Sequence, residues 1–471
     1  MRLSSQEDVV SLWIESIWNN KFFKLSLVIL LAGLTVFYTI PWIVTHSVEK
    51  EYSGVDFQDY WYAGHYLRQG GNAYAAIFND PNPNYWDPRI PGSGDPNKLP
   101  SSEYLLDLPI YYLDGQVAEG YPIAQTLIVA PSITAPLNLP IQLLAWFSWP
   151  TARFMWMTFG LVFAAIIPWL ALQLVDKHSR LSLMDKLIFA LLFYNFYGLR
   201  QSIMIGQQTL ISLLLLTLAL LFRKNWLLSG LLLGFGVSKY SVGLPVFLYF
   251  FLRKEYRTIL VAVLLQVLGI LLIVPLEWGS PLETLVAYYK IFEVNYSQDG
   301  VYLLARFTES WVKVAVFLLV LGTVAYFVGK QYFRNRTLPE PQESALGLND
   351  LNLITLAIFM TTYHRIHDMP FMIFFLLSAM AVMLDFKESI FTSTQKSILY
   401  VGMGILAAIL VVPTGWTFIT SRVVALVDIS ERWSSVEAAS SIGLLIMLGF
   451  SIWFQMKRWS SYERTSIQGG N

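Results

Sequence analysis

The chain has 471 residues, of which 55% are hydrophobic, 15% aromatic and only 14% charged. This composition excludes ordinary soluble domains and indicates a membrane protein with several transmembrane helices. The 32 basic and 32 acidic residues balance, so no net charge favours a nucleic acid or another polyanion as partner. The sequence contains no cysteine, which excludes disulfides, thiolate metal sites and a cysteine nucleophile.

The first apolar stretch, residues 24–44, is too long for a signal-peptide core, and no small-residue cleavage site follows it. We therefore expect a retained transmembrane helix. A window of about 20 apolar residues per crossing predicts further spans at 153–175, 186–204, 208–222, 226–252, 259–276, 311–328, 351–384, 398–412 and 438–454. The prediction is a single all-α transmembrane bundle, residues 1–471, with about 12 crossings. Proline-rich residues 121–139 predict short broken helices, and the stretch 121–175 crosses either once or three times.

The charges between these spans predict the orientation of the chain. Short basic connections mark the cytoplasmic side, and they occur at 176–180, 223–224, 253–257, 330–336, 387–396 and 457–458. Both termini are then expected inside. The outer side receives a long first loop at 45–120, a second large loop at 277–310, and the segments 206–207, 363–370 and 413–437. We expect the functional residues to gather on the outer side.

Two predicted spans are interrupted by polar residues. Residues 226–252 must leave and re-enter the cytoplasm, yet each half around Lys239 is only about 20 Å of helix against a core of about 30 Å. The apex therefore lies below the outer surface. The stretch 351–384 is broken by TTYHRIHDMP, and such breaks persist at membrane depth only inside a cavity enclosed by protein.

The start of the first outer loop, residues 55–74, reads VDFQDYWYAGHYLRQGGNAY. Its apolar residues recur at helical spacing and two glycines end the pattern, which predicts an interfacial helix. Asp56 is placed as an N-cap, and Asp59 three residues later resembles a capping box. The aromatic residues Tyr60 and Trp61 are interpreted first as membrane anchors, with stacking on a sugar or an acceptor as the alternative.

Ionisable residues in the two interrupted spans are candidates for a site. Lys239 lies in a strongly apolar stretch, where a charge is costly and predicts a function; the alternative is a side chain that snorkels to an interface. The break at 363–370 contains His364, Arg365, His367 and Asp368. They favour an anion, although they could instead join two half-helices by hydrogen bonds. His364, His367 and Asp368 could also bind a divalent metal, which no spacing rule excludes.

Four stretches together resemble glycosyltransferase family 87. They are the outer-loop motif at 55–74, YPIAQTLIVAPSITAPL at 121–137, the long stretch 206–257 that begins GQQTLISLLLL, and HRIHDMPFM at 364–372. The resemblance implies an integral-membrane enzyme of the GT-C class, similar to mannosyltransferases that use polyprenyl-phosphate mannose. It also implies a multi-pass protein of the bacterial cytoplasmic membrane whose active site faces the periplasm or the outside.

The resemblance further implies that a sugar passes from a polyprenyl-phosphate donor to a hydroxyl of a lipid or glycan acceptor by inverting displacement. A departing phosphate is already a stable anion, so this chemistry needs a base but no general acid. By the resemblance Asp56 is the base, with Asp59 as the alternative. The expected donor-binding residues are Lys239, His364, Arg365, His367, Asp368, Gln207 and Arg200; for Arg200 a structural ion pair is an equal alternative. No cofactor is expected.

Other classes of protein fit the sequence less well. The chain contains no Walker loop, Rossmann fingerprint, zinc helix motif or nucleophile elbow, which disfavours a nucleotide-sugar donor. The glycine-rich segment 229–236 lies in an apolar helix, where small residues serve close packing. The principal alternative is a transporter or flippase for lipids or small molecules, since broken helices also occur there, but transporters are usually built from repeated halves. A non-catalytic scaffold would show dispersed polar groups.

Overall fold

The computed structural model describes residues 16–17, 20–48, 54, 56–57, 60–61, 64, 137, 140–141, 143–176, 181–273, 310–335, 348–361, 366–384, 393–411 and 436–468. Within these residues every regular element is helical, as expected from the composition. The α-helices are α2 (Lys21–Leu34), α3 (Ile40–Val48), α7 (Trp149–Asp176), α8 (Leu183–Tyr194), α9 (Tyr197–Ile205), α10 (Thr209–Leu221), α11 (Trp226–Val237), α12 (Tyr240–Leu252), α13 (Tyr256–Ile273), α15 (Ser310–Asn335), α16 (Leu348–Thr361), α17 (Ile373–Leu384), α18 (Ser393–Val411) and α20 (Val436–Gln468).

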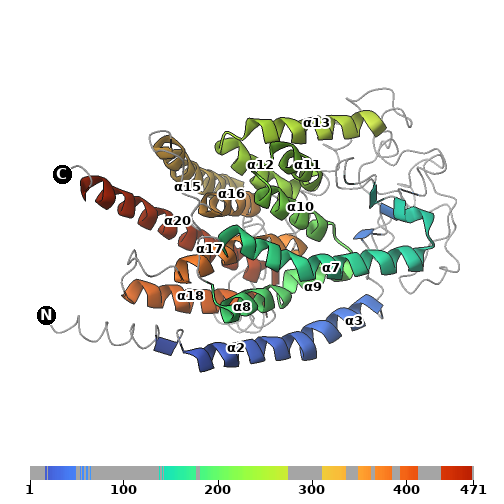
Figure 1. The fold of residues 1–471 in the computed structure, drawn as a ribbon, viewed down its shortest axis with the longest axis horizontal. Coiled ribbons are helices and arrows are strands. Elements are labelled where there is room, and N and C mark those ends of the chain that lie inside the picture. Colours follow the sequence, from blue (N-terminus) through green and yellow to red (C-terminus); the bar gives the residue numbers. More distant parts are fainter. Residues whose placement is uncertain are drawn as a thin grey trace.

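Three shorter elements connect these helices. The π-helical turn η1 (Thr35–Thr39) joins α2 to α3, and the 3₁₀ helices η5 (Leu143–Trp146) and η9 (Ile366–Met372) precede α7 and α17. In Figure 1 the start of α2 and the end of α20 lie on one side of the bundle, at the left, whereas α3 ends and α7 begins at the right. Which side of the membrane these ends occupy stays a prediction from the charges.

In the part of the chain that the structure describes, four helical stretches are long and apolar enough to cross a membrane, and the protein is therefore membrane-integral. They cover Lys21–His46, Trp149–Val175, Trp311–Phe333 and Ser440–Lys457, matching four of the predicted spans. Helices α8 and α9 would make a fifth span, bent by 52°. The other predicted spans are represented by shorter apolar helices, so the number of crossings stays a prediction.

Both predicted interruptions occur in the structure. The span predicted at 226–252 consists of α11 and α12, which meet at Ser238 and Lys239. The span predicted at 351–384 consists of α16 and α17 with η9 between them. The glycine-rich helix packs closely as expected: a side chain at Gly230 would meet the Val261 side chain of α13 at 2.6 Å. Only a residue without a side chain lets α11 and α13 approach this far.

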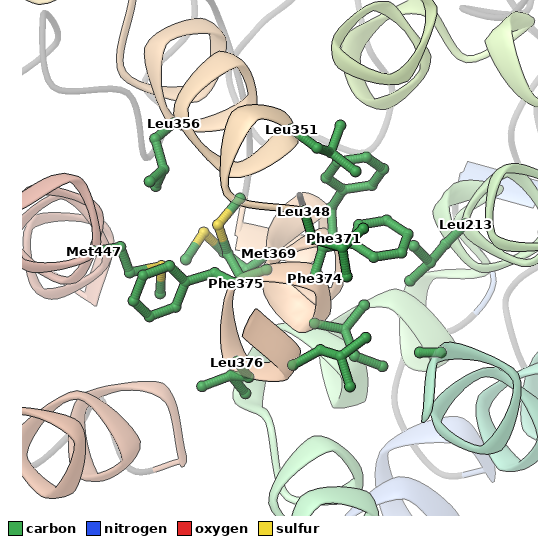
Figure 2. Packing of buried hydrophobic residues seen from close by; sticks show 14 of the residues in the cluster. Leu213, Leu348, Leu351, Leu356, Met369, Phe371, Phe374, Phe375, Leu376 and Met447 are labelled. Atoms are coloured by element: carbon green, nitrogen blue, oxygen red, sulfur yellow. The ribbon is translucent and has the colours of Figure 1, made fainter. Parts of the chain in front are cut away.

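The core of the bundle surrounds η9 and α17. Figure 2 shows Phe371, Phe374 and Phe375 at the centre, with Leu213 of α10 on one side and Met447 of α20 on the other. All three aromatic side chains are at most 1% exposed. A helix that is apolar on every face is stable only when other helices surround it. The described part of the break, η9, is therefore held inside the protein, as a polar interruption at membrane depth requires.

Polar side chains connect neighbouring helices across the bundle. Lys24 of α2 and Asp185 of α8 form an ion pair at 2.6 Å. The Asn352 side-chain amide of α16 donates to the Ser378 hydroxyl of α17 at 2.9 Å. Such contacts satisfy polar groups where no water is available and thereby fix which helix faces meet.

Candidate active site

A chain of polar contacts joins residues from four separate segments. The Gln207 side-chain Nε2 donates a hydrogen bond to Oδ2 of Asp56, 151 positions earlier in the sequence. The Lys239 ammonium donates to Oε1 of the same Gln207 at 2.6 Å and lies 3.1 Å from Oδ1 of Asp368. The Thr209 hydroxyl donates to this Asp368 oxygen at 2.8 Å. We call Asp56, Gln207, Lys239, Asp368 and Thr209 the polar network.

The turn between α9 and α10 positions Gln207. Gly206 ends α9 in the left-handed conformation, with φ of 74°, which glycine adopts without steric cost. A side chain there would also meet Cβ of Phe57 at 2.9 Å. The Trp156 indole of α7 donates to the Gly206 carbonyl at 2.8 Å. The turn is therefore fixed by α7 and presents the Gln207 side chain beside the segment that contains Asp56.

The Asp56 segment is attached to the same turn through its backbone and its apolar side chains. The Gly54 amide donates to the Met204 carbonyl at 2.7 Å. Phe57 is fully buried and stacks on Trp156, with ring centroids 5.0 Å apart. Asp56 itself is helical and half-buried. These contacts hold the carboxylate next to Gln207, although the loop is far from α9 in sequence.

Lys239 lies at the joint between α11 and α12, as the N-cap residue of α12. Its side chain is only 8% exposed, so it points into the protein and does not snorkel to a surface. Because the ammonium can only donate, the Gln207 oxygen must face Lys239 and its NH₂ must face Asp56. Lys239 thereby makes the NH₂ group of Gln207 the donor to Asp56.

The break before α17 contributes Asp368 and His367, both buried. The backbone carbonyl of His367 accepts a hydrogen bond from the Ser202 hydroxyl of α9. Three residues proposed from sequence, Asp59, His364 and Arg365, lie outside the described residues. Residue 58 lies outside them as well. The backbone amides of 58 and 59 would be the partners of the predicted cap at Asp56, so that cap stays a prediction. Within the described residues no group of three His, Asp or Glu side chains lies close enough to hold a metal ion.

Arg200 does not join the polar network. Its guanidinium lies 4.7 Å from the ring centre of Tyr38 and 5.5 Å from that of Trp42, and its Nη2 donates to the Val411 carbonyl at the end of α18. From the sequence, Arg200 is expected among the donor-binding residues, with a structural ion pair as the equal alternative. In the structure the side chain points to η1, α3 and α18, where three aromatic rings and a helix C-terminus stabilise its charge. These contacts assign Arg200 to helix packing.

Tyr60 and Trp61 differ from the interfacial anchors expected from sequence. They are 2% and 3% exposed and belong to a small aromatic core with Trp149 of α7. The Trp61 indole donates to the Phe147 carbonyl at 3.1 Å. The tryptophan-rich start of α7 covers these rings, a long-range contact that helical spacing alone does not reveal. These contacts attach the chain just after Asp56 to the start of α7.

Sequence reasoning missed Thr209. Its hydroxyl has the same Asp368 oxygen as partner that Lys239 has. Thr209 begins α10 two residues after Gln207. A hydroxyl at a helix start, close to a residue already expected in the site, was the feature that could have indicated it. Only its distant partner, 159 positions away, gives that hydroxyl a role.

Comparison with known proteins places the chain in a family. The sequence profile of glycosyltransferase family 87 matches residues 131–384, more than half of the chain. No curated protein and no solved structure matches significantly. The matched range contains Gln207, Lys239, Thr209 and Asp368 and extends further toward the C-terminus than the expected resemblance, whereas Asp56 precedes it. The chain belongs to glycosyltransferase family 87 and is a glycosyltransferase of the membrane.

Proposed function

We propose that this glycosyltransferase moves a sugar, mannose or another hexose or pentose, from a polyprenyl-phosphate donor to a hydroxyl of a lipid or glycan acceptor. The reaction takes place at the outer face of a bacterial cytoplasmic membrane, in a bundle of the GT-C type. One observation carries the proposal: Gln207 connects a half-buried carboxylate, Asp56, directly to a buried cation, Lys239. A base for the hydroxyl and a positive group for the phosphate are what this transfer needs.

Asp56 is the proposed base. Its Oδ2 accepts the Gln207 hydrogen bond, which leaves Oδ1 as the oxygen that takes the proton from the acceptor hydroxyl. As that proton leaves, the hydroxyl oxygen bonds to C1 of the sugar, and the bond from C1 to the phosphate oxygen breaks with its electron pair. The configuration at C1 inverts. The phosphate departs as an anion, so the reaction needs no second carboxylate as an acid.

Lys239 is the proposed contact for the departing phosphate. Its ammonium has three N–H groups, and two of them face Gln207 and Asp368. The Asp368 carboxylate, 3.1 Å away, compensates the buried charge of the lysine. Asp368 repels a phosphate, so we assign it to holding Lys239 and not to direct donor contact. Gln207 likewise orients Asp56 and Lys239, which revises the donor contact expected from sequence.

The first experiment tests which class of sugar donor the enzyme uses. We would reconstitute the purified protein in liposomes and supply radiolabelled polyprenyl-phosphate mannose, or the nucleotide sugar GDP-mannose, with membrane lipid extract as acceptor. The proposal predicts transfer from the lipid-linked donor, and a product whose anomeric configuration is opposite to that of the donor. Transfer from the nucleotide sugar alone would contradict the donor class, and retained configuration would contradict direct displacement.

The same experiment addresses the transporter alternative. Family membership favours an enzyme, and a transporter would move the labelled donor across the bilayer without changing it. Recovery of all label as intact donor on the other side of the membrane, with no glycosylated product, would support the flippase.

A further inference from the structure

A basic pocket of about 560 Å³ lies at the ends of α11 and α12 opposite Lys239. It is lined by residues of two turns, 223–226 and 254–258. Helix α11 has 12 residues, which is about 18 Å of helix. The pocket is therefore well separated from the polar network, and the proposed function does not use it.

Close packing of α11 on α13 brings the two turns together. A side chain at Gly230 would meet the Thr258 carbonyl at 2.8 Å, so the absence of one allows the start of α13 to lie directly against α11. Lys254 ends the first turn after α12 with φ of 61°. Glycine is the usual residue in this conformation, yet the position carries a long cationic side chain that lines the pocket.

The charges of the pocket are strongly unbalanced. Its lining contains four basic side chains, Arg223, Lys224, Lys254 and Arg257, and one acidic side chain, Glu255. Glu255 already lies 3.5 Å from Arg253, outside the pocket. In the part of the chain that the structure describes, Lys224 and Arg257 have no acidic side chain within ion-pair distance. The pocket thus presents cations to an anion that carries more than one charge or several acceptor oxygens.

Two exposed aromatic residues complete the lining. Trp226 is 46% and Tyr256 is 53% exposed, and each begins an apolar helix. Tryptophan and tyrosine at the ends of membrane helices lie at the level of the lipid headgroups. A pocket that combines such rings with several cations lies where the phosphate of a lipid would be.

We propose that this pocket binds the headgroup of an anionic phospholipid in the membrane leaflet opposite the polar network. The cations contact the phosphate oxygens, and the two aromatic residues flank the glycerol region of the lipid. Basic residues that only set the orientation of the chain need no shared pocket, whereas these four line one cavity. The proposal is independent of the sugar-transfer reaction.

Lipid retention tests the proposal on the full-length protein. We would purify the wild type and the triple variant Lys224→Gln, Lys254→Gln, Arg257→Gln in a neutral detergent, add phosphatidylglycerol or phosphatidylcholine, and count bound lipids by native mass spectrometry. Each basic residue near an anionic surface changes affinity by roughly fivefold. We therefore expect the triple variant to bind phosphatidylglycerol at least tenfold more weakly, with no change for phosphatidylcholine.

A matched control removes the same charge elsewhere. Lys21, Lys330 and Lys457 lie on the same predicted side of the membrane but outside the pocket, and their triple Gln variant should bind phosphatidylglycerol like the wild type. Equal loss in both triple variants would overturn the proposal in favour of general surface attraction. Saturation of the pocket by inorganic phosphate without lipid, measured by calorimetry, would also overturn it. Should the triple variant fail to fold, the single variant Arg257→Gln carries the test, with an expected loss of about fivefold.

Discussion

The ion pair between Lys239 and Asp368 makes a prediction about stability that the sequence alone does not. The two side chains are 8% and 5% exposed, and Nζ lies 3.1 Å from Oδ1. Removing one partner of a buried pair leaves the other charge uncompensated, which costs about 3–5 kcal/mol. In Lys239→Met, Asp368 still accepts a hydrogen bond from Thr209. We therefore expect a loss of unfolding free energy at the low end of this range, about 3 kcal/mol.

A second substitution should separate this structural effect from catalysis. In the double variant Lys239→Met, Asp368→Asn the buried negative charge is gone, and the Asn oxygen can still accept the Thr209 hydrogen bond. Replacing both partners of a buried pair by neutral groups is often close to neutral, so stability should return to within about 1 kcal/mol of the wild type. Transfer should stay about a hundredfold or more below the wild type, because the preorganised phosphate contact is lost.

The assay combines unfolding and activity on the same preparations. Unfolding of the detergent-solubilised protein by increasing SDS can be followed by the fluorescence of its 16 tryptophans, and transfer is measured from a polyprenyl-phosphate sugar at matched protein levels. A single variant as stable as the wild type would refute the buried ion pair. A double variant that regains full transfer would show that Lys239 is only structural.

Four further predictions follow from the same contacts. Gln207→Leu removes the hydrogen bonds to Asp56 and Lys239 and should lower transfer by at least tenfold, because it withdraws the group that orients both charges; equal transfer would remove Gln207 from the site. Gly206→Ala should destabilise the protein by at least about 1–2 kcal/mol, since an L-residue is strained at this φ and its Cβ would meet Phe57 at 2.9 Å, as SDS unfolding would show. Arg200→Met should lower stability more than donor affinity, and the reverse result would return Arg200 to the donor site. A cysteine at Ser148 should react with an impermeant maleimide on intact cells, and one at Lys224 only after permeabilisation; the opposite pattern would invert the topology.

Hydropathy predicted the helical class and the interruptions of the bundle well. The spans at 24–44, 153–175, 311–328 and 438–454 each correspond to a long apolar helix, because crossing a bilayer imposes length and composition on the local sequence. The joint at Lys239 and the break before α17 were also predictable, since two short half-helices and a polar run cannot form one regular span. These features depend on residues that are neighbours in the sequence.

The partners within the site could not be predicted in the same way. Asp56 and Gln207 are 151 positions apart, and helical spacing says nothing about which side chains meet at that separation. Arg200 shows the same limit: its position in the sequence was compatible with donor binding or a structural ion pair, and the aromatic rings of Tyr38 and Trp42 determine where it points. Likewise, the aromatic pattern of Tyr60 and Trp61 is compatible with a membrane surface or a protein core, and only contact with Trp149 selects the core.

Asp56→Asn tests the central claim most directly. Asn has nearly the size of Asp, and the structure that holds the segment, including the buried Phe57, is unchanged, so the segment should stay folded, but the amide cannot take up a hydroxyl proton. We would measure single-turnover transfer from a pre-bound polyprenyl-phosphate sugar, together with donor binding, for the wild type and the variant. The account predicts unchanged donor binding and transfer slower by about a hundredfold to ten-thousandfold, the usual contribution of a general base. Transfer within a few fold of the wild type would contradict it and show that Asp56 is not the base.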